Sequence, residues 1–233
     1  MSKRKKNNNR GLFIVFEGLD GAGTTTQTHL LAQYLEKESW PVITTSEPTQ
    51  GPMGLIIRLV LSNRLIFSAG KADLEILSNS SIALLFAADR LDHLQHLIIP
   101  KIEEGVIVIC DRYFLSSYAY QLGNDPKNLE WLKTINARCL APDLTIFIDT
   151  SLSICEKRRA KNRWYQDLYE KPHILSQVIK NYKYAIENIK PEMPIETIDG
   201  NPSEKVVFNE ILSLIKQKFP HMFPGDLPLF PLK

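Results

Sequence analysis

The hydrophobic positions of the chain form short continuous runs that are separated by longer amphipathic segments. Largely apolar runs lie at residues 12–16, 106–110 and 144–148, and less apolar short segments lie at 41–45 and 195–198. A run of this length is typical of a strand that is buried on both faces, as strands are in a parallel sheet. The pattern therefore predicts five strands.

Helical spacing governs the segments between these runs. Leu30, Leu31, Tyr34 and Leu35 recur at intervals that place them on one face of a helix. Strands that alternate with helices predict an α/β fold, with a doubly wound five-stranded parallel sheet and right-handed crossovers. The helices are expected at residues 26–38, 53–61, 74–99, 124–141 and 203–219.

The length of 233 residues and the hydrophobic content of 44% are enough for one sizeable core. We therefore expect a single domain at residues 11–219, flanked by two tails. Residues 1–10 are basic and polar, which predicts a disordered solubilising tail, with contact to a nucleic acid or an acidic surface as the other interpretation. Residues 220–233 carry four prolines among apolar residues, which predicts an extended tail.

The formal net charge is +2, so no strong global field points to a nucleic acid or a membrane as a partner. The most apolar internal stretch, residues 82–88, is too short to span a bilayer, and no apolar segment follows the basic start as in a secretory signal. We therefore expect a cytoplasmic protein. Its three cysteines lack metal-ligand spacing and are expected to be reduced: Cys110, Cys139 and Cys155.

Candidate chemistry begins at residues 16–27, which follow a predicted strand and open a predicted helix. The pattern G-x-x-x-x-G-K-[ST] cradles phosphates with backbone N–H groups at a helix N-terminus. Gly18 and Gly23 fit its glycines, and Thr25 fits the hydroxyl that binds Mg²⁺. Thr24 stands where the lysine is expected. The other interpretation is a glycine-rich turn without a ligand.

Other polar residues accumulate near the predicted carboxyl ends of strands. Glu47-Pro48, Asp89-Arg90 and Asp111-Arg112 lie at or beside this edge, where open α/β sheets bind ligands. Residues 151–170 are rich in Arg and Lys and follow a strand end. They predict a small mobile lid over the same edge.

At these motifs the chain resembles the thymidylate kinases, a family of P-loop nucleoside-monophosphate kinases. The similarity runs from about residue 11 to residue 219, and the motifs occur in the order of the family. It implies a P-loop NTPase-type fold. The matching segments are FEGLDGAG at 16–23, SEP at 46–48, LLFAADR at 84–90, DRYFLSSYAYQ at 111–121 and PDLTIFID at 142–149.

The resemblance implies roles for residues around the acceptor nucleotide. Asp20 would bind the 3′-hydroxyl of the sugar, and Phe86 would stack on thymine. Arg90, one helical turn further on, would donate to a base carbonyl. Arg112 would hold the acceptor phosphate through its planar guanidinium. A turn, an apolar core and a structural ion pair are the alternative explanations for these residues.

Four further positions match the acceptor side of the family. Ser117, Tyr120 and Gln121 correspond to positions around the thymine and the 2′ edge of the sugar, where an aromatic ring would exclude a ribose hydroxyl. An ordinary amphipathic helix is the alternative for them. Glu47 corresponds to the loop at the acceptor phosphate, but Ser46 stands where the family often has an arginine.

The donor side is implied in the same way. Asp111 and Thr25 would help to hold Mg²⁺, and Arg158 and Arg163 would supply cationic charge from the lid. Their basic cluster, which also contains Arg159 and Lys161, could instead be a solvated helix face. The residues expected to hold the phosphates of ATP are Gly18, Gly21, Ala22, Gly23, Thr24, Thr25 and Thr26.

The expected function is transfer of the γ-phosphoryl group of ATP to dTMP, giving dTDP, in a homodimer with Mg²⁺ as cofactor. The expected catalytic residues are Asp20, Asp111, Arg112, Arg158 and Arg163. Because Thr24 replaces the lysine, a nucleotide-binding protein with weak or lost kinase activity is one alternative. A kinase for another nucleoside monophosphate is the second.

Overall fold

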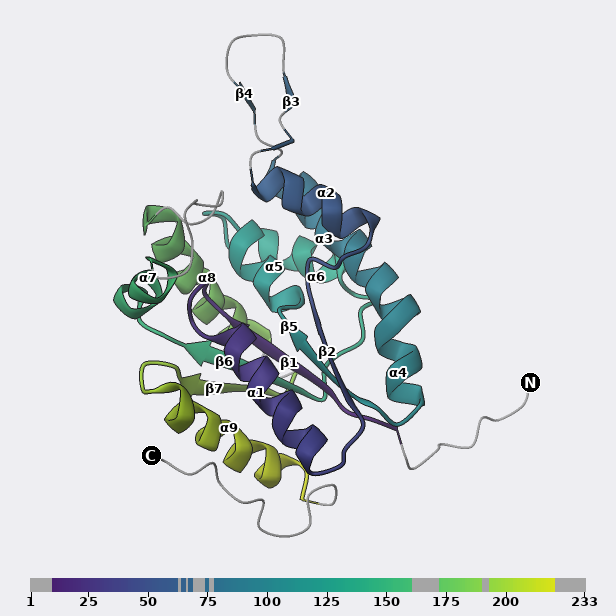
Figure 1. Ribbon diagram of the computed structural model, residues 1–233. Coiled ribbons are helices and arrows are strands. Elements are labelled where there is room, and N and C mark those ends of the chain that lie inside the picture. The colour runs from purple at the N-terminus through teal and green to yellow at the C-terminus, as the bar shows by residue number, and fades with distance from the viewer. Residues whose placement is uncertain are drawn as a thin grey trace, which may run out of the picture.

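A parallel sheet forms the centre of the computed structural model, which describes residues 10–62, 64–65, 67–68, 74–75, 78–160, 172–189 and 193–220. The strand order is β2-β5-β1-β6-β7, and all neighbours run parallel (Figure 1). The five predicted strands are confirmed. They are β1 (Phe13–Gly18), β2 (Val42–Ser46), β5 (Ile107–Asp111), β6 (Leu144–Asp149) and β7 (Ile195–Asp199).

The three central strands are buried along almost their whole length, as their continuous apolar runs predict. Their register brings their carboxyl ends together. Asp111 lies opposite Phe16 of β1 and Ser46 of β2, while Gly18 lies opposite Ile148. The loops that follow β1, β2 and β5 therefore emerge at one edge of the sheet.

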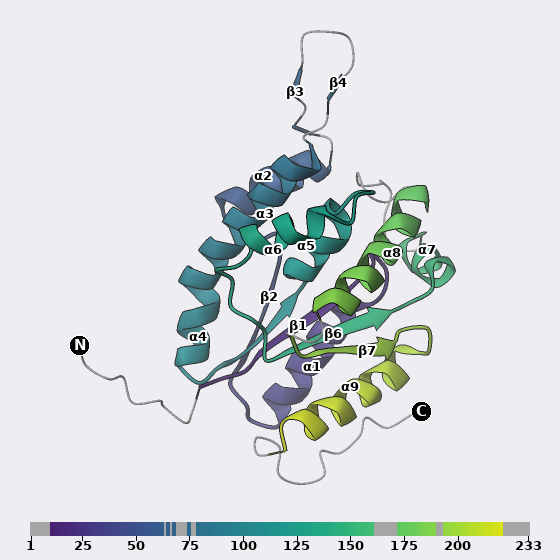
Figure 2. The same cartoon turned by 180° about the vertical axis from the view of Figure 1, so that it is seen from behind.

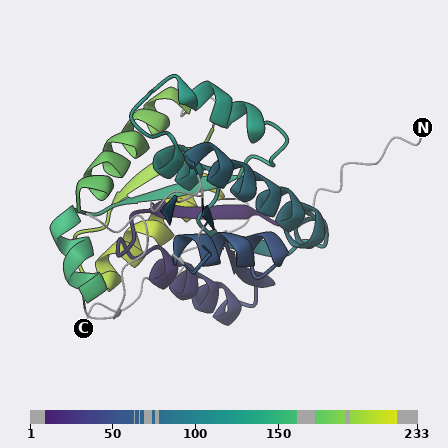
Figure 3. The same cartoon turned by 90° about the horizontal axis from the view of Figure 1, so that it is seen from above.

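Helices cover both faces, which makes the sheet doubly wound. In the view from above, α1 (Thr24–Lys37) and α9 (Glu204–Lys218) lie on one face, and α5 (Phe114–Gln121) and α8 (Pro172–Ile189) lie on the other (Figure 3). Seen from behind, α5, α6 and α8 stand in front of the sheet (Figure 2). The remaining helices are α2 (Pro52–Leu61), α3 (Asn79–His93), α4 (Ile99–Glu103), α6 (Asn128–Ile135) and α7 (Leu152–Ala160).

The prediction of one helix at residues 74–99 is wrong about where the helix begins and about its being unbroken. Leu74–Glu75 forms a short strand, β4, which pairs antiparallel with β3 (Phe67–Ser68). The helix begins at Asn79, where the Ser78 side chain accepts from the N–H of Ser81. A π-helical turn, η1 (Leu94–Ile98), then joins α3 to α4. Pro100 has no N–H to donate to the preceding turn, which accounts for the irregular junction.

Two other predicted helices need correction. The helix expected at 124–141 is limited to α6, because Asp125 accepts from the N–H of Lys127 in a turn before it and Asn136 follows its end. The long helix α8 was not predicted. It matters for the site, because α8 packs on α5.

The expected lid is described only in its first half, as α7. Residues 161–170 with Arg163, residues 1–9 of the first tail and residues 221–233 of the second lie outside the described residues. Within the described part, no helix is both long and apolar enough to cross a membrane.

Candidate active site

The glycine loop lies between β1 and α1, as its sequence context predicts. Gly21 and Gly23 adopt φ values of +86° and +105°, which residues with a Cβ atom rarely adopt. Gly23 precedes α1 without a side-chain cap, so the first N–H groups of the helix are available to an anion. A cavity of about 400 Å³ adjoins them and is lined by residues 21–27, Arg158, Arg159, Gly200, Glu204 and Val207.

Two arginines of α7 hold the backbone of this loop. Arg158 donates to the carbonyl of Ala22 at 3.0 Å and to that of Gly200 at 3.0 Å. Arg159 donates to the carbonyl of Asp20 at 2.6 Å. These two arginines therefore place positive charge beside the glycine loop, although Thr24, which stands where a lysine is expected, is a buried neutral residue.

Thr25 and Asp111 meet at the start of α1. The Thr25 hydroxyl donates to Oδ2 of Asp111, while Oδ1 of Asp111 is buried and has no partner among the described residues. An unpartnered carboxylate oxygen beside a hydroxyl fits Mg²⁺, which is usually held by one or two carboxylates together with substrate phosphates and water. Among the described residues, no group of three or more His, Cys, Asp or Glu side chains is placed to hold a metal ion.

A second cavity, of about 750 Å³, lies at the same edge of the sheet and is larger than the one beside the glycine loop. It is roomy enough for a nucleotide-sized ligand. All eight residues that the sequence places around an acceptor line it: Asp20, Glu47, Phe86, Arg90, Arg112, Ser117, Tyr120 and Gln121.

Arg112 forms one wall of this acceptor cavity. Its backbone has φ +72°, in the left-handed region, and its guanidinium is held by three groups. It donates to the Gly18 carbonyl at 3.0 Å, to the Ser116 hydroxyl at 3.2 Å and to Oδ1 of Asp20 at 2.8 Å. A cation held in this way is a preorganised binding group for a phosphate.

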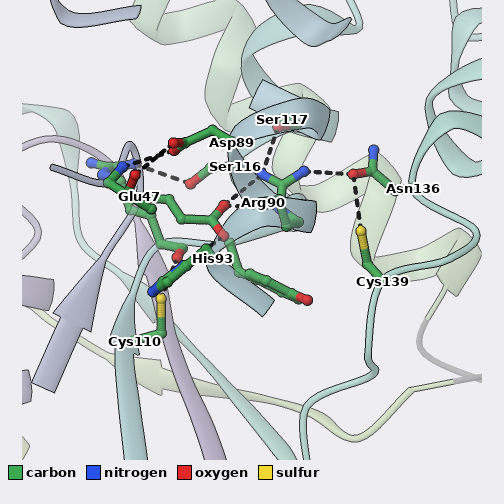
Figure 4. Close-up of polar contacts among 12 residues, drawn as sticks. Glu47, Asp89, Arg90, His93, Cys110, Ser116, Ser117, Asn136 and Cys139 are labelled. Carbon is green, nitrogen blue, oxygen red and sulfur yellow. Dashed lines mark hydrogen bonds and ion pairs between the residues drawn. The ribbon is translucent and has the colours of Figure 1, made fainter. Parts of the chain in front are cut away.

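Arg90 lies deeper and is fully buried. Its Nε donates to Oε2 of Glu47 at 2.8 Å, Nη1 to Asn136 at 2.5 Å and Nη2 to the Ser117 hydroxyl at 3.1 Å (Figure 4). The Tyr113 ring lies against the guanidinium, 5.1 Å from its carbon. The arginine therefore has a single fixed orientation at the wall of the cavity.

The combination of a glycine-loop cavity and an acceptor cavity at one sheet edge suits transfer between two nucleotides. A family model described as thymidylate kinase matches residues 16–211 of the chain. The chain belongs to the thymidylate kinase family. The predicted family and the enzyme class, a nucleoside-monophosphate kinase with ATP as phosphoryl donor, are thereby confirmed.

Individual thymidylate kinases are similar over nearly the whole chain. A probable thymidylate kinase from Pyrococcus abyssi is 41% identical over 212 residues, which are 90% of this chain and 98% of the relative. One from Thermococcus kodakarensis is 38% identical over 209 residues, which are 88% and 97%. A solved structure of thymidylate kinase from Candida albicans is 26% identical with a TM-score of 0.74, and the match covers 91% of this chain and 94% of that one.

Sequence reasoning missed a buried carboxylate that supports this site. Glu17, at the end of β1, accepts from the N–H groups of Tyr113 and Ser116 at 2.9 and 3.1 Å and from the Ser116 hydroxyl at 2.5 Å. Burial raises the pKa of Glu17 to about 7, although Ser116 and the Arg112 charge oppose the shift. Glu17 thus fixes the segment that follows Arg112. A charged residue inside a buried strand was the available signal.

Two other residues of the site gave no local signal. The Tyr182 hydroxyl, on α8, donates to the Gly18 carbonyl at 3.1 Å and lies 2.9 Å from the Ser116 hydroxyl. Arg58, on α2, donates to the carbonyl oxygens of Pro48 and Thr49 and lines the acceptor cavity. Their places depend on packing between helices and loops, which the periodicity of one segment does not encode.

Proposed function

We propose that this member of the thymidylate kinase family transfers the γ-phosphoryl group of ATP to dTMP, giving ADP and dTDP. An oxygen of the dTMP phosphate would form the new bond to the γ-phosphorus, while the bond from that phosphorus to the oxygen bridging it to the β-phosphorus breaks. The observation that carries the proposal is the Asp20–Arg112 contact, because it joins the glycine loop to the wall of the acceptor cavity.

The donor half of the site is proposed to lie on the glycine loop. The backbone N–H groups at the start of α1 would bind the phosphates of ATP, and six candidate phosphate residues, 21–26, line the cavity there. Gly18 does not line this cavity. Its carbonyl instead accepts from Arg112 and Tyr182. We therefore assign Gly18 a structural role in the loop and not a contact with the phosphates.

The acceptor half would be the cavity around Arg112 and Arg90. Arg112 would hold the phosphate of dTMP, and Asp20 the 3′-hydroxyl of its sugar. The base would lie against Phe86 and receive a hydrogen bond from Arg90, with Ser117 and Gln121 nearby.

Tyr120 is proposed to exclude ribonucleotides. Its ring packs against the guanidinium of Arg112, with 5.6 Å between the ring centre and the guanidinium carbon. In the proposed pose, a ring fixed in this position would meet a 2′-hydroxyl of the sugar. Arg58 could supply the cation that is missing at Ser46, because it reaches the same cavity from α2.

Thr25 and Asp111 would hold Mg²⁺ next to the phosphates. The ion, when bound, would neutralise phosphate charge, as in other phosphoryl transferases. We further propose that Arg158 and Arg163 compensate for the missing lysine. In support, the guanidinium of Arg158 lies 3.8 Å from the position that a Cβ atom on Gly23 would take.

The remaining expectations also stay proposals: one kinase domain at 11–219, a cytoplasmic location and a homodimer. Leu84 and Leu91 lie seven positions apart on α3, so they lie on one face of this helix, and they are 52% and 39% exposed. Such an apolar surface is compatible with a partner. Light scattering of the purified chain tests the dimer.

The decisive test is ADP formation with ATP, Mg²⁺ and dTMP in a coupled assay. We expect dTMP to be preferred over dUMP and UMP, and thymidine to be a poor substrate because it brings no phosphate to Arg112. No turnover above background would favour a nucleotide-binding protein without catalysis. Faster turnover with another monophosphate would reassign the acceptor.

A further inference from the structure

The side chain of His93 links the end of β2 to the acceptor cavity. It is the last residue of α3, and it is buried. Its Nδ1 lies 3.2 Å from Oε1 of Glu47, and its Nε2 lies 2.7 Å from the Thr45 hydroxyl (Figure 4). Because a carboxylate oxygen only accepts, Nδ1 must be the donor to Glu47. In the neutral ring, Nε2 then accepts from Thr45.

Glu47 connects His93 to Arg90, because it contacts both side chains. One carboxylate oxygen, Oε1, faces His93, and the other, Oε2, accepts from Nε of Arg90 at 2.8 Å and forms an ion pair with its Nη2 at 2.8 Å. Both side chains of the Glu47–Arg90 pair are about 1% exposed. A buried carboxylate that loses one of its donors carries a substantial desolvation cost. Without His93, Glu47 would turn or admit water, and Arg90 would turn with it.

The orientation of Arg90 depends on few groups. An arginine has five N–H groups. The hydrogen bonds of Nε to Glu47, of Nη2 to Ser117 and of Nη1 to Asn136, together with the ion pair of Nη2 with Glu47, account for four of them in the described structure. One N–H of Nη1 is left for a ligand of the cavity that Arg90 lines. Its direction is set mainly by Glu47, which takes two of the four contacts.

We propose that His93 is a positioning residue for the acceptor base, acting through Glu47 on Arg90. The inference rests on the proposed function, in which Arg90 donates to the base. It also gives Glu47 a different role from the one expected, since its carboxylate is engaged by Arg90 and His93 and would act on the acceptor through Arg90. His93 does not line the acceptor cavity itself, so its effect on dTMP is indirect.

The test separates the two ring nitrogens of His93. In His93→Asn the amide nitrogen stands near the place of Nδ1 and keeps the donor to Glu47, whereas in His93→Gln the amide reaches toward Thr45. We expect His93→Gln and His93→Leu to raise the KM for dTMP about tenfold. The free energy of one hydrogen bond to a charged group corresponds to a change in affinity of about this size. His93→Asn should stay within about threefold of wild type.

Two other readouts distinguish positioning from general damage. The KM for ATP and kcat should change less than about twofold, because lost ground-state binding of one substrate appears in its own KM. His93→Gln should add little when Glu47→Gln is already present, since the two act in series. His96→Gln is the matched control, because the exposed His96 pairs only with Asp92 among the described ion pairs and should leave both KM values unchanged.

Equal rises in the KM for dTMP in all three His93 variants, with a parallel rise in the KM for ATP and a lower melting temperature, would show a purely structural role and overturn the proposal. An unchanged KM in His93→Gln and His93→Leu would also overturn it. If the wild type did not phosphorylate dTMP, the proposed function would fail first. The His93 series would then be measured with dUMP or UMP, whichever the wild type accepts.

Discussion

Nη2 of Arg112 lies 2.8 Å from Oδ1 of Asp20, although the two residues are 92 positions apart in the chain. The contact joins the loop after β1 to the loop after β5, and these strands are neighbours with Phe16 opposite Asp111. The parallel register therefore places the proposed ligand of the sugar beside the proposed ligand of the acceptor phosphate. It also makes Arg112 the residue whose replacement tests the acceptor site most directly.

Replacing Arg112 with Lys should lower kcat/KM for dTMP by at least about 100-fold. Lysine keeps the charge but loses the planar fork that binds two phosphate oxygens and holds Asp20 at the same time. Initial rates at varied dTMP measure the effect. Arg10→Lys is the matched control, because Arg10 pairs with Asp143 at the surface. A loss below about threefold in Arg112→Lys would contradict the proposed role.

Glu17 should make the stability of the protein depend on pH. Burial raises its pKa from 4.5 to about 7. Between these values the folded state binds a proton that the unfolded state has released, so this group stabilises the fold below about pH 4.5 and the contribution is lost as the pH rises through 7. A shift of this size corresponds to about 3 kcal/mol.

Glu17→Gln removes this titration while keeping an oxygen for the N–H groups of Tyr113 and Ser116. The free energy of unfolding of the variant, relative to wild type, should therefore rise by about 3 kcal/mol between pH 4.5 and pH 8. Urea denaturation at a series of pH values measures it. Glu36→Gln, on the exposed side of α1, should show no such trend. Parallel pH profiles for wild type and Glu17→Gln would disprove the assignment.

The fold was largely predictable because its strands carry their own signal. The runs that form β1, β5 and β6 are continuous and apolar, and the predicted bounds differ from the observed ones by at most two residues. The junction of α3, η1 and α4 was not predictable in the same way, since helical periodicity continues through the π turn. Likewise, the start of α3 depends on the Ser78 cap and on the β3–β4 pairing.

That the residues expected around an acceptor lie together was predictable to the extent that motifs carry them, and their roles stay predictions. Each of the eight expected residues lines the cavity, because the motifs lie at strand ends that the sheet brings together. The supporting residues were not found. Glu17 was hidden inside a strand, and Tyr182 and Arg58 reach the site from helices whose packing no local pattern specifies. The link from His93 to Glu47 depends on a contact across 46 positions.

Removing the Thr25 hydroxyl should raise the requirement for Mg²⁺. Thr25→Ala takes away the donor to Asp111 and one proposed oxygen ligand, so we expect the Mg²⁺ concentration for half-maximal turnover to rise at least about tenfold. Thr26→Ser, at the next position of α1, is the control. Activity is measured over a titration from chelated to millimolar Mg²⁺. An unchanged half-maximal concentration in Thr25→Ala would remove this residue from the proposed metal site.

The residue that supplies positive charge in place of the missing lysine can be identified by removing an arginine and introducing a lysine at position 24. Arg158→Ala should lower kcat about tenfold or more, because a cation beside the transferred phosphate stabilises the transition state. The loss alone is ambiguous, since Arg158 also donates to the carbonyl oxygens of Ala22, Gly200 and Pro202. Thr24→Lys resolves it.

A lysine at position 24 would restore charge at the phosphates, but it would not restore those three carbonyl contacts. We therefore expect Thr24→Lys to recover much of kcat in the Arg158→Ala background while the melting temperature stays at the value of Arg158→Ala. Lys157→Ala, on the exposed side of α7, should leave kcat unchanged. If Arg158→Ala kept full turnover, or if Thr24→Lys failed to rescue it, the compensating cation would have to come from elsewhere in the lid, and Arg163→Ala would be the next variant to measure.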